Sequence, residues 1–157
     1  MSKPRWLSSD EQAAWRAYVH ATKMLHEEMD RQLQRDAGLP FTYYEILVAL
    51  SEAPDRTLRM SELADFTRSS RSRLSHAVAR LEENGWVRRE VCETDRRGAM
   101  AILTDTGMAV LVDAAPGHVE AVRNLVFDLL SASQLKQFER IHRTIRDNLA
   151  AREAAEE

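Results

Sequence analysis

The chain has 157 residues, of which 44% are hydrophobic and 30% are charged, and its net charge is −3. This length and composition predict one globular domain. No apolar run reaches the roughly 20 residues of a membrane span, and the N-terminal sequence lacks the apolar segment of a secretory signal, so we expect a cytoplasmic protein. The single cysteine permits no internal disulfide. We expect no cofactor and no metal, and an enzyme is the least favoured class, because no zinc-ligand spacing, phosphate loop or nucleophile motif occurs.

The first predicted helix begins after Ser8, which precedes Glu11 with the spacing of a capping box, and ends at Gly38. Side chains recur along it in steps of three and four residues, which predicts a packing stripe of Trp15, Tyr18, Thr22, Leu25, Met29 and Leu33. A second capping box over Thr42–Glu45 predicts a helix that continues through Leu50.

A helix-turn-helix is predicted next. A short helix over Ser61–Phe66 is followed by a tight turn over Thr67–Ser70, and Ser70 can cap the second helix. In that helix the apolar residues with helical spacing, which we expect to face inward, are Leu74, Val78 and Leu81.

The apolar period then changes from that of a helix to that of a strand. Val87–Cys92 alternates, Ala99–Leu103 is compatible with a strand, and Asp95–Gly98 between them predicts the tip of a hairpin. A hairpin directly after a helix-turn-helix makes the motif winged.

Two helices are predicted after the hairpin. Thr104 can cap the first, which runs to about Leu130 with a kink or break at Pro116. Ser131 and Gln134 form a capping box for the last helix, whose apolar face consists of Leu135, Phe138, Ile141, Ile145 and Leu149.

Charge is distributed unevenly along the chain. Residues 68–97 contain eight arginines against five acidic residues, which leaves this segment at +3 and the remainder at −6. A basic segment on an acidic body suits a surface that faces a polyanion. The alternative is an ordinary solvated charged face.

The residue types of this segment suit DNA. With the apolar residues facing inward, the side chains left on the open face of the second helix are Ser72, Arg73, Ser75, His76 and Arg80. Arginine can bond guanine O6 and N7 together, and serine and histidine can bond base edges or phosphates. Ser70 at the helix start allows close approach to phosphate. Arg68 and Arg71 suit phosphate contacts, and Arg96 or Arg97 could enter a minor groove.

Three stretches between residues 57 and 104 carry a family resemblance: MSELAD, SRSRLSHAVARLEENGWVRRE and TDRRGAMAILTDTG. Together they resemble the multiple antibiotic resistance regulator (MarR) family. The resemblance implies a homodimeric winged-helix repressor of pseudo-palindromic DNA, with residues 70–80 as recognition helix. It implies that Arg97 enters the minor groove and that Asp95 helps to hold the wing. Arg68 departs from the pattern, since many members carry glycine or a small apolar residue there.

The expected fold is mainly α with a small β-hairpin wing, within a single domain over residues 1–157. A winged helix-turn-helix core spans about residues 41–104, and N- and C-terminal dimerisation helices flank it at about 8–37 and 105–150. The apolar stripes of the first and last helices could each pack within their own chain. The resemblance favours an obligate homodimer, which would place two recognition helices in successive major grooves, about 34–36 Å apart.

Many members of the family release DNA when a small, often aromatic anionic effector enters a cleft beside the dimerisation helices. Candidate lining residues here are Trp15, Tyr18, His26, Tyr43 and Tyr44, with Arg16 or Arg73 for an anionic group. The alternatives are that Trp15 and Tyr18 belong to the core and that His26 is an ordinary surface histidine.

Cys92 is a candidate redox site. If Val87 and Val91 form the buried face of their strand, Cys92 is exposed beside Arg88 and near Arg96 and Arg97. Neighbouring arginines stabilise a thiolate, which oxidants attack. The alternative is an incidental small residue, and any disulfide would be intermolecular.

Two further functions remain open from the sequence. A structural, nucleoid-type protein could use the same winged helix without regulated specificity. The arginine-rich face could also bind an acidic protein instead of DNA.

Overall fold

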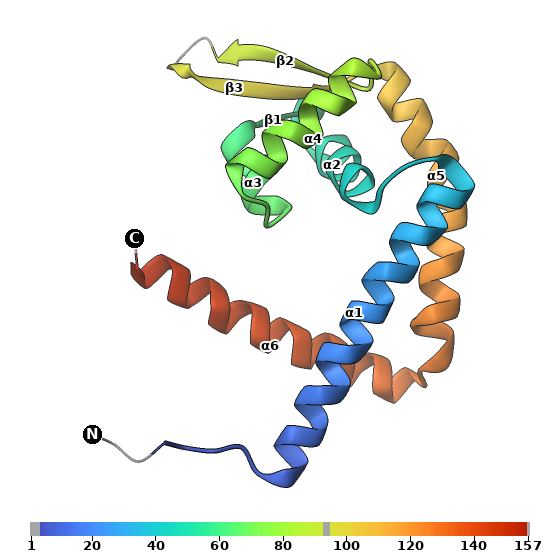
Figure 1. Ribbon diagram of the computed structural model, residues 1–157, viewed down its shortest axis with the longest axis vertical. Coiled ribbons are helices and arrows are strands. Elements are labelled where there is room, and N and C mark those ends of the chain that lie inside the picture. Colours follow the sequence, from blue (N-terminus) through green and yellow to red (C-terminus); the bar gives the residue numbers. More distant parts are fainter. Residues whose placement is uncertain (1–3, 93–94, 157) are drawn as a thin grey trace. The chain divides into compact units, whose positions relative to one another are not determined.

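The computed structural model describes residues 4–92 and 95–156, and at residues 92, 95–97 and 156 it describes the backbone alone. The chain divides into two compact units, Met1–His118 and Val119–Glu157. The first contains the small sheet and the helical segments up to His118, and the second contains the helical segments that follow (Figure 1).

Helix α1 (Ser9–Ala37) begins and ends where the sequence predicts. The Ser8 amide donates to Glu11 Oε2 at 2.8 Å, the Glu11 amide donates to Ser8 Oγ at 3.2 Å, and Gly38 ends the helix with φ 62°. Only Met29, Gln32 and Leu33 of this helix are buried. The rest of the first unit therefore packs against only the C-terminal third of α1. The side chains in the N-terminal part of the predicted stripe are not buried.

Helix α2 (Phe41–Glu52) begins one residue before the predicted capping box, so that box is wrong. Pro40 occupies the N-cap and no side chain caps the helix locally. The carboxylate of Asp30 on α1 accepts a hydrogen bond from the Phe41 amide at 2.9 Å instead. A tertiary contact thus satisfies the helix end that a local cap would serve.

The predicted helix-turn-helix is confirmed. Helix α3 (Met60–Phe66) is followed by a turn and by α4 (Arg71–Glu83). Ser70 caps α4 by accepting a bond from the Arg73 amide at 3.3 Å. A short 3-10 helix, η1 (Pro54–Arg56), connects α2 to the segment before α3.

The sheet is antiparallel with strand order β1-β3-β2, formed by β1 (Thr57–Arg59), β2 (Val87–Cys92) and β3 (Asp95–Leu103). The sequence did not predict β1. The predicted hairpin tip at Asp95–Gly98 is wrong, because these residues belong to β3 and Cys92 pairs with Asp95 after a shift in register at Val91/Cys92. Polar composition suggested a turn there, but backbone pairing along a solvated hairpin does not need apolar side chains.

The core of the first unit surrounds α2. Its largest fully buried side chains include residues of α2, α3, α4 and β2, namely Ile46, Leu47, Leu50, Leu63, Leu74, Val78, Leu81 and Val87. Each such side chain contributes about 1.5–3 kcal/mol when removed from water. This core fixes α4 against α2 and α3, and so fixes which face of α4 is open.

Helix α5 (Asp105–Leu125) is capped by Thr104, whose Oγ1 accepts from the Gly107 amide at 3.0 Å. It passes through Pro116 unbroken and ends before the predicted Leu130. Of the predicted kink or break, the break is therefore wrong, and a proline removes only one backbone bond of a helix. The second unit holds the end of α5, the 3-10 helix η2 (Phe127–Leu129) and α6 (Ala132–Glu156). The capping box of α6 is confirmed, with reciprocal bonds of 2.9 and 3.3 Å between Ser131 and Gln134.

Candidate nucleic-acid interface

Helix α4 has two chemically distinct faces. Leu74, Ala77, Val78 and Leu81 are buried in the core. The exposed side chains are those predicted for the open face: Ser72, Arg73, Ser75, His76 and Arg80. The core therefore orients a polar and cationic surface away from the unit.

The arginines of α4 differ in their partners. Among the described residues, Arg71 and Arg73 have no carboxylate partner. Arg80 Nη1 lies 2.7 Å from Glu83 Oε2, and this hydrogen bond raises the pKa of Arg80. The N-terminal half of the helix thus presents the cations that are available to an external anion.

The turn between α3 and α4 contains Arg68 at φ 50°, in the left-handed region. Non-glycine residues rarely adopt this conformation, and glycine does so at little cost. Glycine would therefore suit this position. Here an exposed arginine occupies it, beside the start of α4.

The hairpin of β2 and β3 forms the wing, and its two strands pair antiparallel. The side chains of Cys92, Asp95, Arg96 and Arg97 lie outside the described residues, so their predicted roles stay predictions. Val87 is buried but Val91 is 70% exposed, because the hairpin extends beyond the core after its first residues. The Cys92 prediction assumed that Val87 and Val91 are both buried, and this assumption is wrong for Val91. Arg88 pairs with Glu90 on the same strand.

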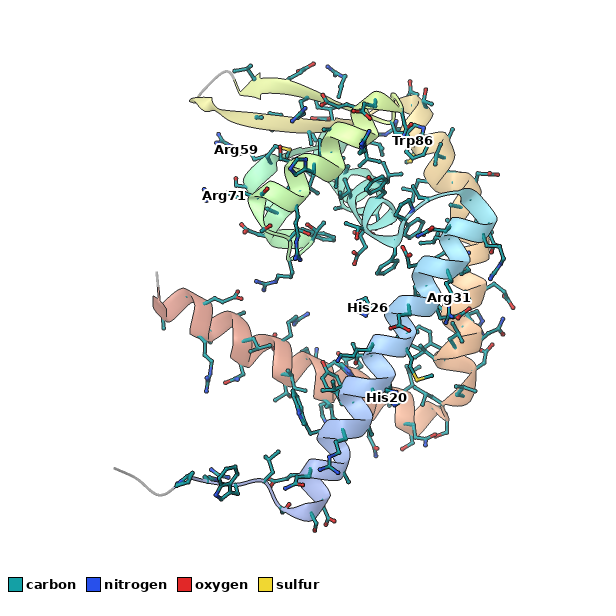
Figure 2. All side chains as sticks on the ribbon, viewed as in Figure 1. His20, His26, Arg31, Arg59, Arg71 and Trp86 are labelled. Carbon is teal, nitrogen blue, oxygen red and sulfur yellow. The ribbon has the colours of Figure 1, made fainter. Side chains whose placement is uncertain are left out.

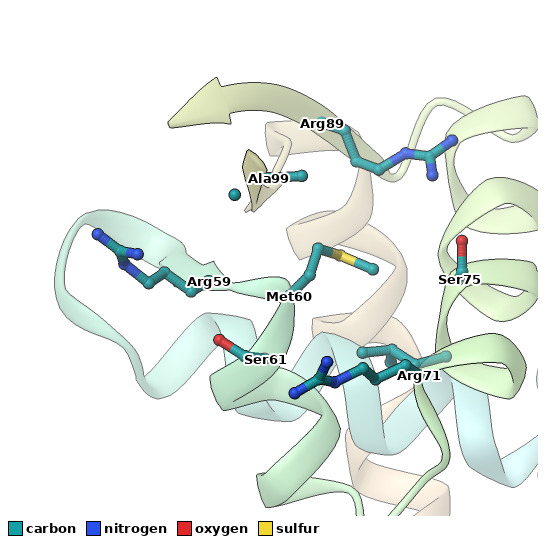
Figure 3. Close-up of a pocket in the computed structure, with 9 residues that line it drawn as sticks. Arg59, Met60, Ser61, Arg71, Ser75, Arg89 and Ala99 are labelled. Carbon is teal, nitrogen blue, oxygen red and sulfur yellow. The ribbon is translucent and has the colours of Figure 1, made fainter. Parts of the chain in front are cut away.

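A cleft of about 420 Å³ lies between α4, the wing, the end of β1 and the start of α3. Three arginines and two serines line it: Arg59, Arg71, Arg89, Ser61 and Ser75. Figure 3 shows Arg71 extending from α4 toward Ser61, with Met60 between the walls and Arg89 extending toward α4. Glu82 on α4 holds Arg89 by accepting bonds from its amide at 2.9 Å and its Nε at 2.5 Å.

Sequence reasoning missed Arg59, Ser61 and Arg89 as members of this cleft. Arg89 lies within the basic segment, which is a signal that could have found it. Arg59 reaches the cleft through the pairing of β1 with β3, in which it lies opposite Met100. Figure 2 shows Arg59 and Arg71 on neighbouring elements.

The predicted effector residues separate into two places. Tyr18 and His26 line a groove of about 390 Å³ along α1, together with Val19, Thr22, Lys23 and Glu27. Trp15 lies beside Tyr18, with ring centroids 6.0 Å apart. Trp15 is 58% exposed and Tyr18 is 42% exposed, so their assignment to the core of the chain is wrong.

Tyr44 is buried, away from that groove, and its ring lies 4.5 Å from the ring of His118. His118 Nδ1 lies 3.3 Å from Gln32 Oε1, and Gln32 Nε2 donates to Asp36 Oδ2 at 3.0 Å. A carboxylate only accepts, so the Gln32 carbonyl faces His118 and Nδ1 must hold the proton. Burial lowers the pKa of His118. These residues join α1, α2 and α5 within the first unit.

The described residues contain no group of three or more His, Cys, Asp or Glu side chains that could hold a metal ion. No described helix combines the length and apolar character that crossing a bilayer requires.

Comparison with known proteins places this geometry in a family. The model of the MarR family matches residues 37–98. Sco3205, a MarR family transcriptional regulator from Streptomyces coelicolor whose crystal structure is in complex with DNA, is 57% identical with a TM-score of 0.89, over 93% of this chain and 92% of Sco3205.

Two further relatives agree. AbsC, a MarR family transcriptional regulator from the same organism, is 41% identical with a TM-score of 0.88, over 94% of this chain and 99% of AbsC. The transcriptional repressor MprA of Escherichia coli is 27% identical over 134 residues, which are 85% of this chain and 75% of MprA. The winged helix-turn-helix, the exposed cationic face of α4 and these relatives show that the chain belongs to the MarR family of transcriptional regulators.

Proposed function

We propose that the protein is a homodimeric transcriptional repressor that binds a pseudo-palindromic operator through α4 and the wing, and that it is not an enzyme. The observation that supports this most is the open face of α4, where Arg73, Ser75 and His76 are exposed while the opposite face fills the core. That Sco3205, at 57% identity, was crystallised in complex with DNA supports DNA as the ligand.

In this proposal the residues have distinct roles. Arg73 reads base edges in the major groove, where an arginine bonds guanine bidentately. Arg80 joins it by exchanging its bond to Glu83 for a base edge. Phosphate contacts fix the register of the protein on the duplex. We assign these contacts to Arg68, Ser70, Arg71 and Ser72. At the wing Arg97 enters the minor groove, Arg96 lies beside the backbone, and Asp95 holds the hairpin.

Exposed apolar faces support a dimer. On α6, Leu135 is 42% exposed and Ile141 is 53% exposed, and the remaining members of that stripe, Phe138, Ile145 and Leu149, are open too. A stripe of this size is unusual on a monomer and typical of a helix-packing seam. A second copy of the chain would cover it.

Release of DNA has two candidate triggers. The groove on α1 combines apolar walls with Lys23 and His26, which suits a small aromatic ligand with an anionic group. Oxidation of Cys92 in the wing strand is the other trigger, because it would alter the hairpin that holds Arg97.

The test is binding of the purified protein to fragments selected from genomic DNA and to random duplexes of equal length. We expect a specificity ratio of about 10³ or more. Equal affinity for both would favour a nucleoid-type protein, and no duplex binding at low salt would favour an acidic protein partner. DNA binding by wild-type protein and by Cys92→Ser is then measured after peroxide treatment. If peroxide releases DNA from wild-type protein but not from Cys92→Ser, oxidation of Cys92 is the trigger. If peroxide leaves binding by wild-type protein unchanged, the small ligand is the remaining candidate.

A further inference from the structure

One cluster of side chains joins the long helices α1 and α5 to α2. His118 on α5 has its ring centroid 4.5 Å from that of Tyr44 and 5.9 Å from that of Phe41, both on α2. Its Nδ1 lies 3.3 Å from Gln32 Oε1 on α1. We expect α1 and α5 to lead to the dimer interface and α2 to belong to the DNA-binding core. The cluster therefore lies where these two parts of the chain meet.

His118 supplies the polar contact between its turn of α5 and α1. Gln32 is 4% exposed, and its amide group donates to Asp36 Oδ2 at 3.0 Å, which leaves the Gln32 carbonyl for the N–H of His118. Pro116 is exposed and Gly117 has no side chain, so neither residue provides a comparable contact. The position of this turn against α1 thus depends on the state of His118.

The first turn of α2 depends on the same cluster. No side chain caps α2 locally, and Asp30 on α1 accepts a hydrogen bond from the Phe41 amide at 2.9 Å. The rings of Phe41 and Tyr44 in this turn pack against His118. Because α4 packs against α2 in the core, a displacement of His118 would reach the helix that supports α4.

A second proton would destabilise His118 in this position. The neutral ring holds one proton, at Nδ1, and bonds Gln32. The charged ring would keep that bond but would lie half-buried against two aromatic rings, where a charge is poorly hydrated. Burial accordingly lowers the pKa of His118. Turning out to solvent would hydrate the charge and would give up the Gln32 bond and the ring contacts.

The packed helices carry other groups that could titrate in place of His118. These are Asp30, Asp36 and His26 on α1 and Tyr44 and Glu45 on α2. His26 contacts Phe41, with ring centroids 5.7 Å apart. Burial raises the pKa of Glu45, which brings its titration toward that of histidine. His26 and Glu45 are therefore the two residues from which His118 must be distinguished.

We propose that His118 is a proton-sensitive contact through which acidification weakens operator binding. The uncharged ring holds α5 against α1 and α2, and the charged ring turns out to solvent and releases them. The two α4 helices of a dimer then lose the fixed spacing that paired half-sites require. This inference rests on the proposed function, and it adds the proton to the ligand and the oxidant as a signal.

The experiment measures the affinity of the full-length protein for a selected operator and for a random duplex of equal length. Both are titrated at about pH 7.5 and about pH 5.5, on either side of the ordinary histidine pKa near 6.5. His118→Gln keeps an N–H donor for Gln32 but carries no charge, and His118→Arg is charged at both pH values. The matched controls are His26→Gln, Glu45→Gln and, on the exposed face of α4, His76→Gln. Circular dichroism confirms that each variant is folded at each pH.

In wild-type protein, we expect acidification to lower operator affinity about fivefold or more, as is typical of coupling between two sites. Affinity for random DNA should not fall, because attraction to phosphates does not require a fixed helix spacing. The three controls should keep the fall in operator affinity. His118→Gln should lose the fall, and His118→Arg should bind operator weakly at both pH values.

The coupling must also act in reverse, because linkage between two binding events is reciprocal. Operator binding should lower the pKa of His118 further. Nuclear magnetic resonance of the histidine ring protons measures this in free and operator-bound protein, and the resonance that is absent from His118→Gln identifies His118. The titration decides the question even if His118→Arg does not fold.

Equal operator affinity at both pH values in wild-type protein, or a fall that His118→Gln retains, would overturn the proposal. Loss of the fall in His26→Gln or Glu45→Gln, or the same pKa of His118 in free and bound protein, would also overturn it. Failure of the proposed function has a different signature. Wild-type protein would then bind operator and random duplexes equally at the higher pH, where His118 is neutral.

Discussion

Gly107 shows how tightly single positions are constrained near the wing. A Cβ added to Gly107 would lie 2.1 Å from the carbonyl oxygen of Trp86, which is backbone and cannot move aside. Thr104 Oγ1 also lies 2.7 Å from Gly85 O. The first turn of α5 is therefore held directly against the segment that joins α4 to β2.

Gly107→Ala should lower the free energy of unfolding by about 3 kcal/mol or more, since it overpacks rigid backbone. Gly117→Ala in the same helix is the matched control. The nearest atom to its added Cβ is 3.5 Å away, so we expect no loss and up to about 1 kcal/mol of gain from helix propensity. Urea denaturation of both variants measures the difference. Equal effects at the two positions would contradict the close contact at Trp86.

His118 should make stability depend on pH. Burial lowers its pKa, so the folded chain binds the proton less readily than the unfolded chain. The groups around it are Gln32 and Asp36 from α1 and Phe41 and Tyr44 from α2. The contribution of neutral His118 to the free energy of unfolding is fully present above about pH 6.5, the pKa of histidine in the unfolded chain. It is lost as the pH falls below that value toward the lower pKa of His118 in the folded chain.

We therefore expect the free energy of unfolding to decline between about pH 7 and pH 5.5, and His118→Gln to decline less. The measurement is urea denaturation at several pH values. A His118→Gln slope identical to that of wild type would assign the dependence to other groups.

At the scale of elements, the two faces of α4 should respond differently to substitution. Leu74→Ala removes a side chain that is 2% exposed and should cost about 2–5 kcal/mol of unfolding free energy. Arg73→Ala should leave stability within about 0.5 kcal/mol and weaken operator binding by about 1–3 kcal/mol. Denaturation and DNA titration on both variants check this. Loss of stability without loss of binding in Arg73→Ala would contradict the orientation of α4.

Most elements were predictable because their signals are local. Ser8 with Glu11, Ser70, and Ser131 with Gln134 cap their helices as the sequence indicates. The errors lie where distant contacts decide. Asp30 takes over the start of α2, and β1 is three residues long and exists only because β3 pairs with it.

The candidate site follows the same division. The exposed side chains of α4 were predictable, since one helical period determines which face is open. The cleft was not, because Arg59 and Arg89 approach α4 only through strand pairing and through the contact of Glu82 with Arg89.

At the scale of the whole molecule, the open apolar faces predict a dimer. Ile141→Asp places a charge on the α6 stripe, where Ile141 is 53% exposed. We expect this variant to be monomeric at micromolar concentration and to lose operator affinity, because one half-site contact is then lost. Analytical ultracentrifugation measures the mass. Arg143→Asp, on the same helix outside the stripe, should remain dimeric. A dimeric Ile141→Asp would remove α6 from the interface.

The most direct test of the account is a hydroxyl-radical footprint on a selected operator, with the stoichiometry measured in parallel. We predict two protected half-sites about 10–10.5 base pairs apart, occupied by two chains per duplex. At the protein concentration that just protects the operator with wild-type protein, Arg73→Ala should leave both half-sites largely unprotected. Continuous protection without half-sites, or a footprint that Arg73→Ala leaves unchanged, would contradict recognition of an operator by paired α4 helices.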